Sequence, residues 1–131
     1  MQISNIDLQR ITYNVLLVSA DSEYLKKIKN DLIEEFNQIQ FWEATGGYEA
    51  LNLLEAHNIT TVISDSALPD LGGPELFERA QRHNRDQIPF IFLSSQQEKA
   101  SMKEKVFSLG VLEHVEKSYD NYDLAHKVRN L

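Results

Sequence analysis

Three short runs of apolar residues constrain the fold of this chain more than any other feature of its sequence. They are Val15–Val18, Val62–Ile63 after a lead-in of two threonines, and Phe90–Leu93. None of them alternates with polar residues, and a continuous apolar run is typical of a strand in a parallel sheet that is covered on both faces. Two weaker strands are predicted at 40–44 and 111–115.

Segments with helical spacing of apolar residues follow these strands. The spacing is carried by Leu25, Ile28, Leu32 and Phe36; by Ala50, Leu51 and Leu54; by Leu76, Phe77 and Ala80; by Met102, Val106 and Phe107; and by Leu124, Val128 and Leu131. Five βα units imply right-handed crossovers and a five-stranded parallel sheet with helices on both faces, in the flavodoxin-like order 2-1-3-4-5. The expected fold class is therefore α/β.

Size and composition narrow the classes of function. The chain has 131 residues, enough for one domain with a core of its own, and it has no cysteine for disulfides or thiolate metal sites. Its net charge of -7 argues against direct contact with nucleic acid or an anionic membrane. No apolar run approaches the length of a membrane span and no leader pattern is visible, so we expect a cytoplasmic setting.

The domain itself is predicted to span residues 13–131. Residues 1–12 precede the first predicted strand, and we expect them to form an N-terminal arm. The chain stops at Leu131, where the apolar spacing of its last predicted helix still continues and no helix-ending residue such as glycine or proline has appeared. We therefore expect it to be part of a longer protein.

Asp65 is the strongest candidate for a functional residue. It ends the second apolar run and enters a turn rich in proline and glycine, so it lies at the sheet edge where open α/β folds place their sites. Ser94 and Lys117 follow the next two strands and are expected nearby. A carboxylate, a hydroxyl and an ammonium suit phosphoryl transfer, which depends on positioning and on stabilising negative charge. Taken alone, Asp65 has the alternative interpretation of a turn or capping residue.

Four motifs stand in order along the chain. They are Ala44-x-x-Gly47-x-Glu49-Ala50-Leu51, Asp65-x-x-Leu68-Pro69-x-Leu71-x-Gly73, Ile88-Pro89-x-Ile91-x-Leu93-Ser94, and Gly110 with Lys117. Together they resemble the receiver domain of two-component response regulators, over residues 13–131. The resemblance implies that Asp65 accepts a phosphoryl group from a histidine kinase or phosphotransfer protein, that Ser94 is the switch hydroxyl, and that Lys117 pairs with the phosphate.

The chain departs from that family where the family holds Mg²⁺ with two acidic residues after the first strand. Ser19 and Ala20 occupy these positions, whereas Mg²⁺ prefers oxygens of carboxylates, phosphates and water. Asp21 comes next; it either reaches back into the site or caps the first helix, and capping is the favoured interpretation. The resemblance leaves Asp65, Asp21 and the backbone carbonyl of Ala67 as metal ligands, and Mg²⁺ is predicted to bind weakly or not at all.

Two further departures concern the fifth predicted strand and its end. Ser118 stands where the family has a proline that is joined to the lysine by a cis bond. A bond between Lys117 and Ser118 should prefer trans by about 2.5 to 4 kcal/mol. His114 stands where the family has its switch aromatic, and it is either a switch residue with a pH dependence or a plain surface residue.

The leading hypothesis is a receiver that is not an enzyme. Phosphorylation of Asp65 would pull Ser94 inward and reshape one face of the domain, which then binds an output domain or partner protein. That face is formed by the fourth predicted helix, around Met102, by the fifth predicted strand, at 111–115, and by the fifth predicted helix, around Leu124. The runner-up is a phosphorylation-independent pseudo-receiver that acts as an interaction or dimerisation module, and a homodimer is left open.

A phosphatase is disfavoured because alanine stands at position 67, where a second acid is needed. A flavin or dinucleotide domain is disfavoured because residues 19–23 contain no glycine.

Overall fold

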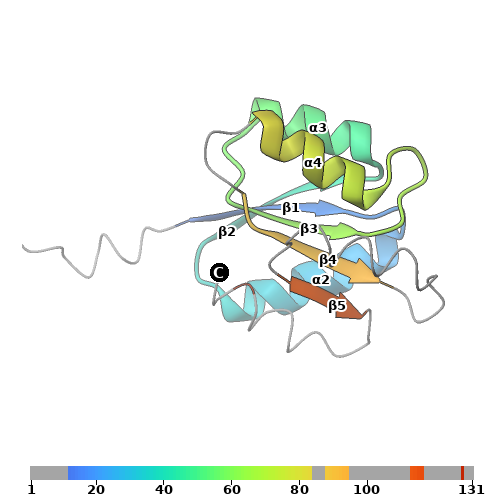
Figure 1. Ribbon diagram of the computed structural model, residues 1–131. Coiled ribbons are helices and arrows are strands. Elements are labelled where there is room, and N and C mark those ends of the chain that lie inside the picture. The colour runs from blue at the N-terminus through green and yellow to red at the C-terminus, as the bar shows by residue number, and fades with distance from the viewer. Residues whose placement is uncertain (1–11, 84–87, 95–112, 117–127, 129–131) are drawn as a thin grey trace, which may run out of the picture.

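The computed structural model describes residues 12–83, 88–94, 113–116 and 128. The strands are β1 (Tyr13–Val18), β2 (Ile39–Ala44), β3 (Thr61–Asp65), β4 (Phe90–Ser94) and β5 (Glu113–Glu116). The helices α2 (Ser22–Glu35), α3 (Gly47–Ala56) and α4 (Gly73–His83) alternate with the first four strands (Figure 1). In this part of the chain no helix is both long and apolar enough to cross a membrane.

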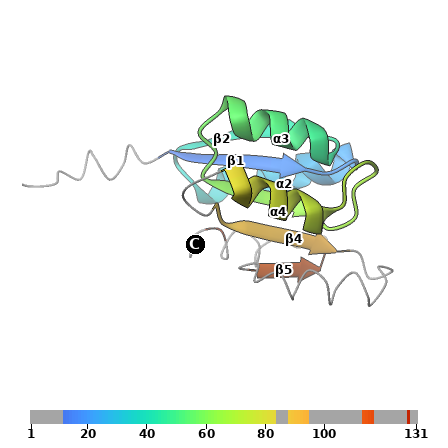
Figure 2. The same ribbon diagram turned by 45° about the horizontal axis from the view of Figure 1, so that its top comes forward.

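The strands form one parallel sheet in the order β2-β1-β3-β4-β5. β3 therefore lies between β1 and β4, and its last residue, Asp65, is in register with Leu93. Helices α3 and α4 cover one face of the sheet and α2 covers the other, as the two views in Figures 1 and 2 show. The predicted α/β fold with a parallel sheet and helices on both faces is confirmed.

Several predicted elements fall outside the described residues. They are the helix predicted around Met102, the N-terminal arm predicted over residues 1–12 apart from Thr12, and the last predicted helix apart from Val128, which is helical and buried. The weak strand predicted at 111–115 overlaps the observed β5, Glu113–Glu116, and its first two residues lie outside the described part of the chain.

Each face of the sheet has its own hydrophobic core. Alternate residues of β1 enter opposite cores: Leu16 and Val18 pack on the side of α3 and α4, whereas Val15 and Leu17 pack on the side of α2. The same division holds for β3 and β4. The apolar runs do not alternate with polar residues because both side-chain directions end in a core.

The start of α4 packs directly against β4 and the end of β3. The backbone N–H of Gly73 donates to the carbonyl of Ser66 at 3.0 Å. A Cβ atom added to Gly73 would lie 2.7 Å from Cε1 of Phe92, 2.8 Å from the Ser66 carbonyl oxygen and 2.9 Å from the Asp65 carbonyl oxygen. Only a hydrogen fits at this position, so Gly73 sets how closely α4 approaches the end of β3.

This close approach predicts that Gly73→Ala destabilises the domain by about 1 to 3 kcal/mol, because backbone atoms and a buried ring must move to admit the methyl group. The matched control is Gly72→Ala, where the added Cβ would lie 3.8 Å from Cδ of Pro74, an ordinary contact distance. Urea unfolding of both variants measures the difference. Equal midpoints for G73A and G72A would show that the contact at Gly73 is not tight in solution.

Candidate functional site

Three polar residues lie where the central strands end. Ser19 follows β1, Asp65 ends β3 and Ser94 ends β4. Their exposed fractions are only 1%, 7% and 2%, respectively. Polar groups buried to this extent need hydrogen-bond partners or a function that supplies them.

Ser19 is hydrogen-bonded directly to Asp65. Its Oγ donates to Oδ2 of Asp65 at 2.6 Å, within a buried pair. The same Oγ accepts the backbone N–H of Asp21 at 3.1 Å. Because that N–H occupies the lone-pair side of the hydroxyl, the Ser19 proton is directed at the carboxylate. Sequence reasoning treated Ser19 only as a missing acid and did not foresee its role as a donor.

Asp21 is the N-cap residue of α2. Its Oδ1 accepts the backbone N–H of Tyr24 at 3.1 Å, and its own backbone is extended, as expected of a cap. The interpretation of Asp21 as a helix cap is confirmed. Its exposed carboxylate serves the helix terminus.

The oxygen donors around Asp65 do not fit a magnesium site of the family type. The Ser19 hydroxyl points its proton at the carboxylate, Ala20 has only a methyl group, and Asp21 caps α2. Across the described ranges, no three histidine or acidic side chains are grouped so that they could hold a metal ion. Mg²⁺ needs near-octahedral oxygen ligation, usually with one or two carboxylates. Of Ser19, Ala20, Asp21 and Asp65, Asp65 alone offers a carboxylate that is not engaged in capping a helix.

The other predicted site residues have different outcomes. Oγ of Ser94 is buried and has no hydrogen-bond partner among the described residues. His114 lies on β5, where its backbone is in register with Phe92, but its side chain is outside the described part of the structure. Lys117 and Ser118 also lie outside the described residues, whereas Ala67 is exposed in the loop after β3.

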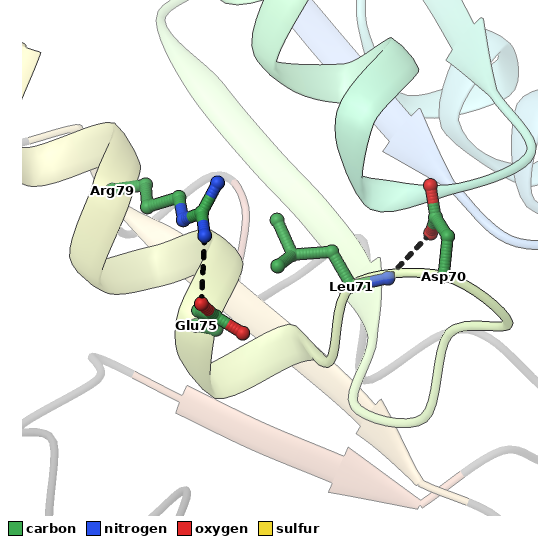
Figure 3. Close-up of polar contacts among 4 residues, drawn as sticks. All are labelled: Asp70, Leu71, Glu75 and Arg79. Carbon is green, nitrogen blue, oxygen red and sulfur yellow. Dashed lines mark hydrogen bonds and ion pairs between the residues drawn. The ribbon is translucent and has the colours of Figure 1, made fainter.

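Asp70 lies in the loop between β3 and α4 and caps a different helix. Its Oδ1 accepts the backbone N–H of Gly47 at 2.8 Å and of Leu71 at 2.7 Å, and its Oδ2 accepts the N–H of Tyr48 at 3.2 Å. Figure 3 shows the Leu71 contact. These backbone hydrogen bonds, led by those from Gly47 and Leu71, lower the pKa of Asp70 below its usual value.

Asp70 caps α3 from outside the helix, because the N-cap residue of α3 has no side chain that could do so. Gly46 occupies the N-cap position of α3, and it supplies no side-chain hydrogen bond. Sequence reasoning missed Asp70, although the pair Gly46 and Gly47 at the start of a helix without a local capping side chain was a usable signal.

Comparison with known proteins gives a consistent result. The profile of the response regulator receiver domain matches residues 15–129. A "Probable transcriptional regulator ycf29" of Pyropia yezoensis is 30% identical over 125 residues, which are 92% of this chain and 54% of the relative. The chain thus spans about half the length of this curated relative.

Two solved structures share the fold. A response regulator receiver protein from Pseudomonas putida has a TM-score of 0.81 at 21% identity and covers 92% of this chain and 98% of its own. The response regulator protein TrrA from Thermotoga maritima, solved in complex with Mg²⁺-BeF, has a TM-score of 0.77 at 24% identity and covers 91% and 98% of the two chains. With the profile match over most of its length, this chain belongs to the response regulator receiver domain family.

The hydrogen bond between Ser19 and Asp65 predicts a loss of stability in Ser19→Ala. A hydrogen bond to a carboxylate contributes about 1.5 to 3 kcal/mol, compared with about 0.5 to 1.5 kcal/mol for a neutral pair. The matched control is Ser66→Ala, because Oγ of Ser66 is equally buried but donates to a neutral acceptor, the Leu93 carbonyl, at 3.2 Å. Urea unfolding at neutral pH should show the larger loss in S19A, and an equal or smaller loss would contradict the contact.

The lowered pKa of Asp70 predicts that the free energy of unfolding decreases at acidic pH. The Asp70 carboxylate binds a proton less readily in the folded state than in the unfolded state. The ionised carboxylate therefore contributes its full share to the free energy of unfolding above the unfolded pKa, and this share is lost as pH falls through the folded pKa. Unfolding free energies measured at decreasing pH below about 5 should therefore fall less steeply in Asp70→Asn than in the wild type. Glu34→Gln, which removes one exposed carboxylate from α2, controls for net charge, and a D70N profile parallel to the wild type would refute the assignment.

Proposed function

We propose that Asp65 accepts a phosphoryl group from the histidine of a kinase or phosphotransfer protein. The observation that supports this proposal best is Ser94, whose buried hydroxyl lies at the end of the strand next to Asp65 and has no partner among the described residues. A buried hydroxyl without a partner is costly, by about 1 to 3 kcal/mol. An oxygen of a phosphoryl group on Asp65 would provide the acceptor that Ser94 lacks there.

The proposed transfer uses the Asp65 carboxylate as the nucleophile. One carboxylate oxygen forms a bond to phosphorus while the bond from phosphorus to the donor imidazole breaks, and the electron pair of that bond stays on the imidazole nitrogen. Ser19 holds Oδ2 of Asp65 during the approach and so restrains rotation of the carboxylate. The charge that arrives is stabilised by Ser94 and, as the family resemblance implies, by Lys117.

Magnesium has no assigned step in this scheme, because the residues next to Asp65 do not fit it. The Ser19 hydroxyl stabilises the carboxylate by hydrogen bonding, but it carries no charge to balance the incoming phosphoryl group. We therefore expect phosphorylation to be slow, or to depend on a donor with high transfer potential.

The proposed output is a conformational change that is read by another domain or protein, with no released product. The expected response surface is the face formed by the helix predicted around Met102, by β5 and by the last predicted helix around Leu124, with His114 of β5 as the residue that switches together with Ser94. An output domain in the same protein is consistent with the relative named as a transcriptional regulator, which is about twice as long as the matched region.

A pseudo-receiver that works by binding alone is the second candidate, and one observation favours it. The 2.6 Å hydrogen bond from Ser19 gives Asp65 a neutral, internal partner, so the resting site is satisfied on this side without a cation. In this alternative the domain would keep the fold as an interaction or dimerisation module.

Intact mass after incubation with acetyl phosphate, with and without Mg²⁺, decides between the two candidates. We expect the wild type to gain the mass of one phosphoryl group, Asp65→Asn to gain none, and Ser94→Ala to gain it more slowly. Circular dichroism should first show that each variant is folded. If folded wild-type protein gains no mass at high donor concentration under either condition, phosphoryl acceptance is excluded and the pseudo-receiver is favoured.

A further inference from the structure

The β3–α4 loop, defined here as residues 66–72, begins and ends beside Asp65. At its start, the N–H of Ser66 donates to the carbonyl of Leu93 at 3.0 Å. At its end, the N–H of Gly73 donates to the carbonyl of Ser66, also at 3.0 Å. The atoms around Gly73 leave no space for a Cβ atom. Both ends of the loop are therefore tightly packed against the carboxyl end of β3.

The middle of the loop is attached to α3. Leu71 is buried in the core beneath α3 and α4, and Asp70 accepts the first two backbone N–H groups of α3. A Cβ atom at Gly46 would lie 2.7 Å from Oδ1 of Asp70, and one at Gly47 would lie 2.6 Å from Cβ of Leu71. The backbone of Gly46 is extended, with φ of -156°, so glycine is needed there for close approach and not for its backbone conformation.

A second contact joins the first turn of α3 to α4. The guanidinium of Arg79 lies 5.7 Å from the ring centroid of Tyr48, a cation–π distance. Glu75 accepts a hydrogen bond from Arg79 at 2.9 Å and holds the guanidinium in place (Figure 3). This hydrogen bond is the main cause that raises the pKa of Arg79. The Tyr48 side chain is 52% exposed, so the first turn of α3 presents an aromatic ring at the surface. The position of that ring depends on the contacts with Arg79 and Asp70.

We infer that Asp70 is a positioning residue that couples the surroundings of the Asp65 carboxylate to the first turn of α3. The ends of the β3–α4 loop are too tightly packed to absorb a shift at Asp65, and such packed segments move between discrete arrangements. The shift therefore reaches Asp70. Because α3 has no side-chain cap at Gly46, any change in the Asp70 contact is felt by the N–H groups of Gly47 and Tyr48.

This coupling goes beyond the proposed function and does not require phosphoryl transfer. It adds the first turn of α3, with Tyr48, as a second response surface next to the one expected around β5. It also explains the presence of two adjacent glycines at the start of α3, since larger residues at Gly46 and Gly47 would push the β3–α4 loop away from the helix.

A double-mutant cycle tests the coupling. The variants are Asp65→Asn, Asp70→Ala and the combination of the two, and the measurement is amide hydrogen exchange at Gly47 and Tyr48 by NMR. D70A should speed exchange at both amides. D65N should also change their exchange in the presence of Asp70, and this effect should disappear in its absence. We expect the rates of the double variant to differ from the product of the single effects by about threefold or more.

The control cycle pairs Asp65→Asn with Glu49→Gln. Glu49 lies in the same first turn of α3, but its Oε2 accepts from Thr45, at 3.4 Å from the backbone N and 3.2 Å from Oγ1, and makes no contact with Asp70 that the described residues show. Its effects should add to those of D65N within about twofold. Additive behaviour of D65N and D70A would overturn the inference, because a merely structural cap would give that result.

The exchange cycle and the phosphorylation assay by intact mass test the two proposals separately. If D70A does not fold, Asp70→Asn replaces it in the cycle, since the amide retains one acceptor oxygen but loses the charge, and additivity of D70N with D65N would equally overturn the inference. A failure of the proposed function is seen as the absence of phosphoryl gain in the wild type. That failure leaves the exchange cycle and its interpretation unchanged.

Discussion

The covering of the parallel sheet on both faces decides where polar chemistry is possible in this domain. Every residue of β3 and β4 is buried, so each polar side chain on these strands carries a desolvation cost that a hydrogen bond or a bound group must offset. Ser19, Asp65 and Ser94 lie at the carboxyl ends of the central strands. The register of β1, β3 and β4 then brings the three side chains to one edge of the sheet. The site is thus a consequence of how the sheet is buried.

Ser19 changes how the negative charge of Asp65 is compensated at this site. In a receiver with acidic residues at this point a cation would compensate the carboxylates, whereas here a neutral hydroxyl donates to Asp65 and is itself oriented by the N–H of Asp21. Asp21 is held in turn by its role as the cap of α2. The start of α2 and the Asp65 carboxylate therefore form one hydrogen-bonded unit, and a change in either affects the other. This arrangement makes both phosphoryl acceptance and binding alone reasonable functions for the domain.

Asp70 extends this interdependence to the other face of the sheet. The β3–α4 loop returns to the end of β3 and caps α3 on the way, so the site contacts α2 through Ser19 and α3 through Asp70. The aromatic ring of Tyr48 and the guanidinium of Arg79 continue the connection from α3 to α4. Helices on both faces of the sheet are thereby connected by hydrogen bonds and packing to the end of β3.

Local patterns of the sequence were sufficient for the fold class, the approximate strands, the candidate Asp65 and the capping role of Asp21. These features depend on periodicity, or on residues a few positions apart, which can be recognised without knowing the tertiary structure. Only the tertiary structure decided that Ser19 donates to Asp65, 46 residues along the chain, and that Asp70 caps a helix that begins 23 residues before it. Both contacts depend on the register of neighbouring strands and on the close packing at Gly46, Gly47 and Gly73, because hydrogen bonding requires an approach within about 3 Å that no local pattern specifies.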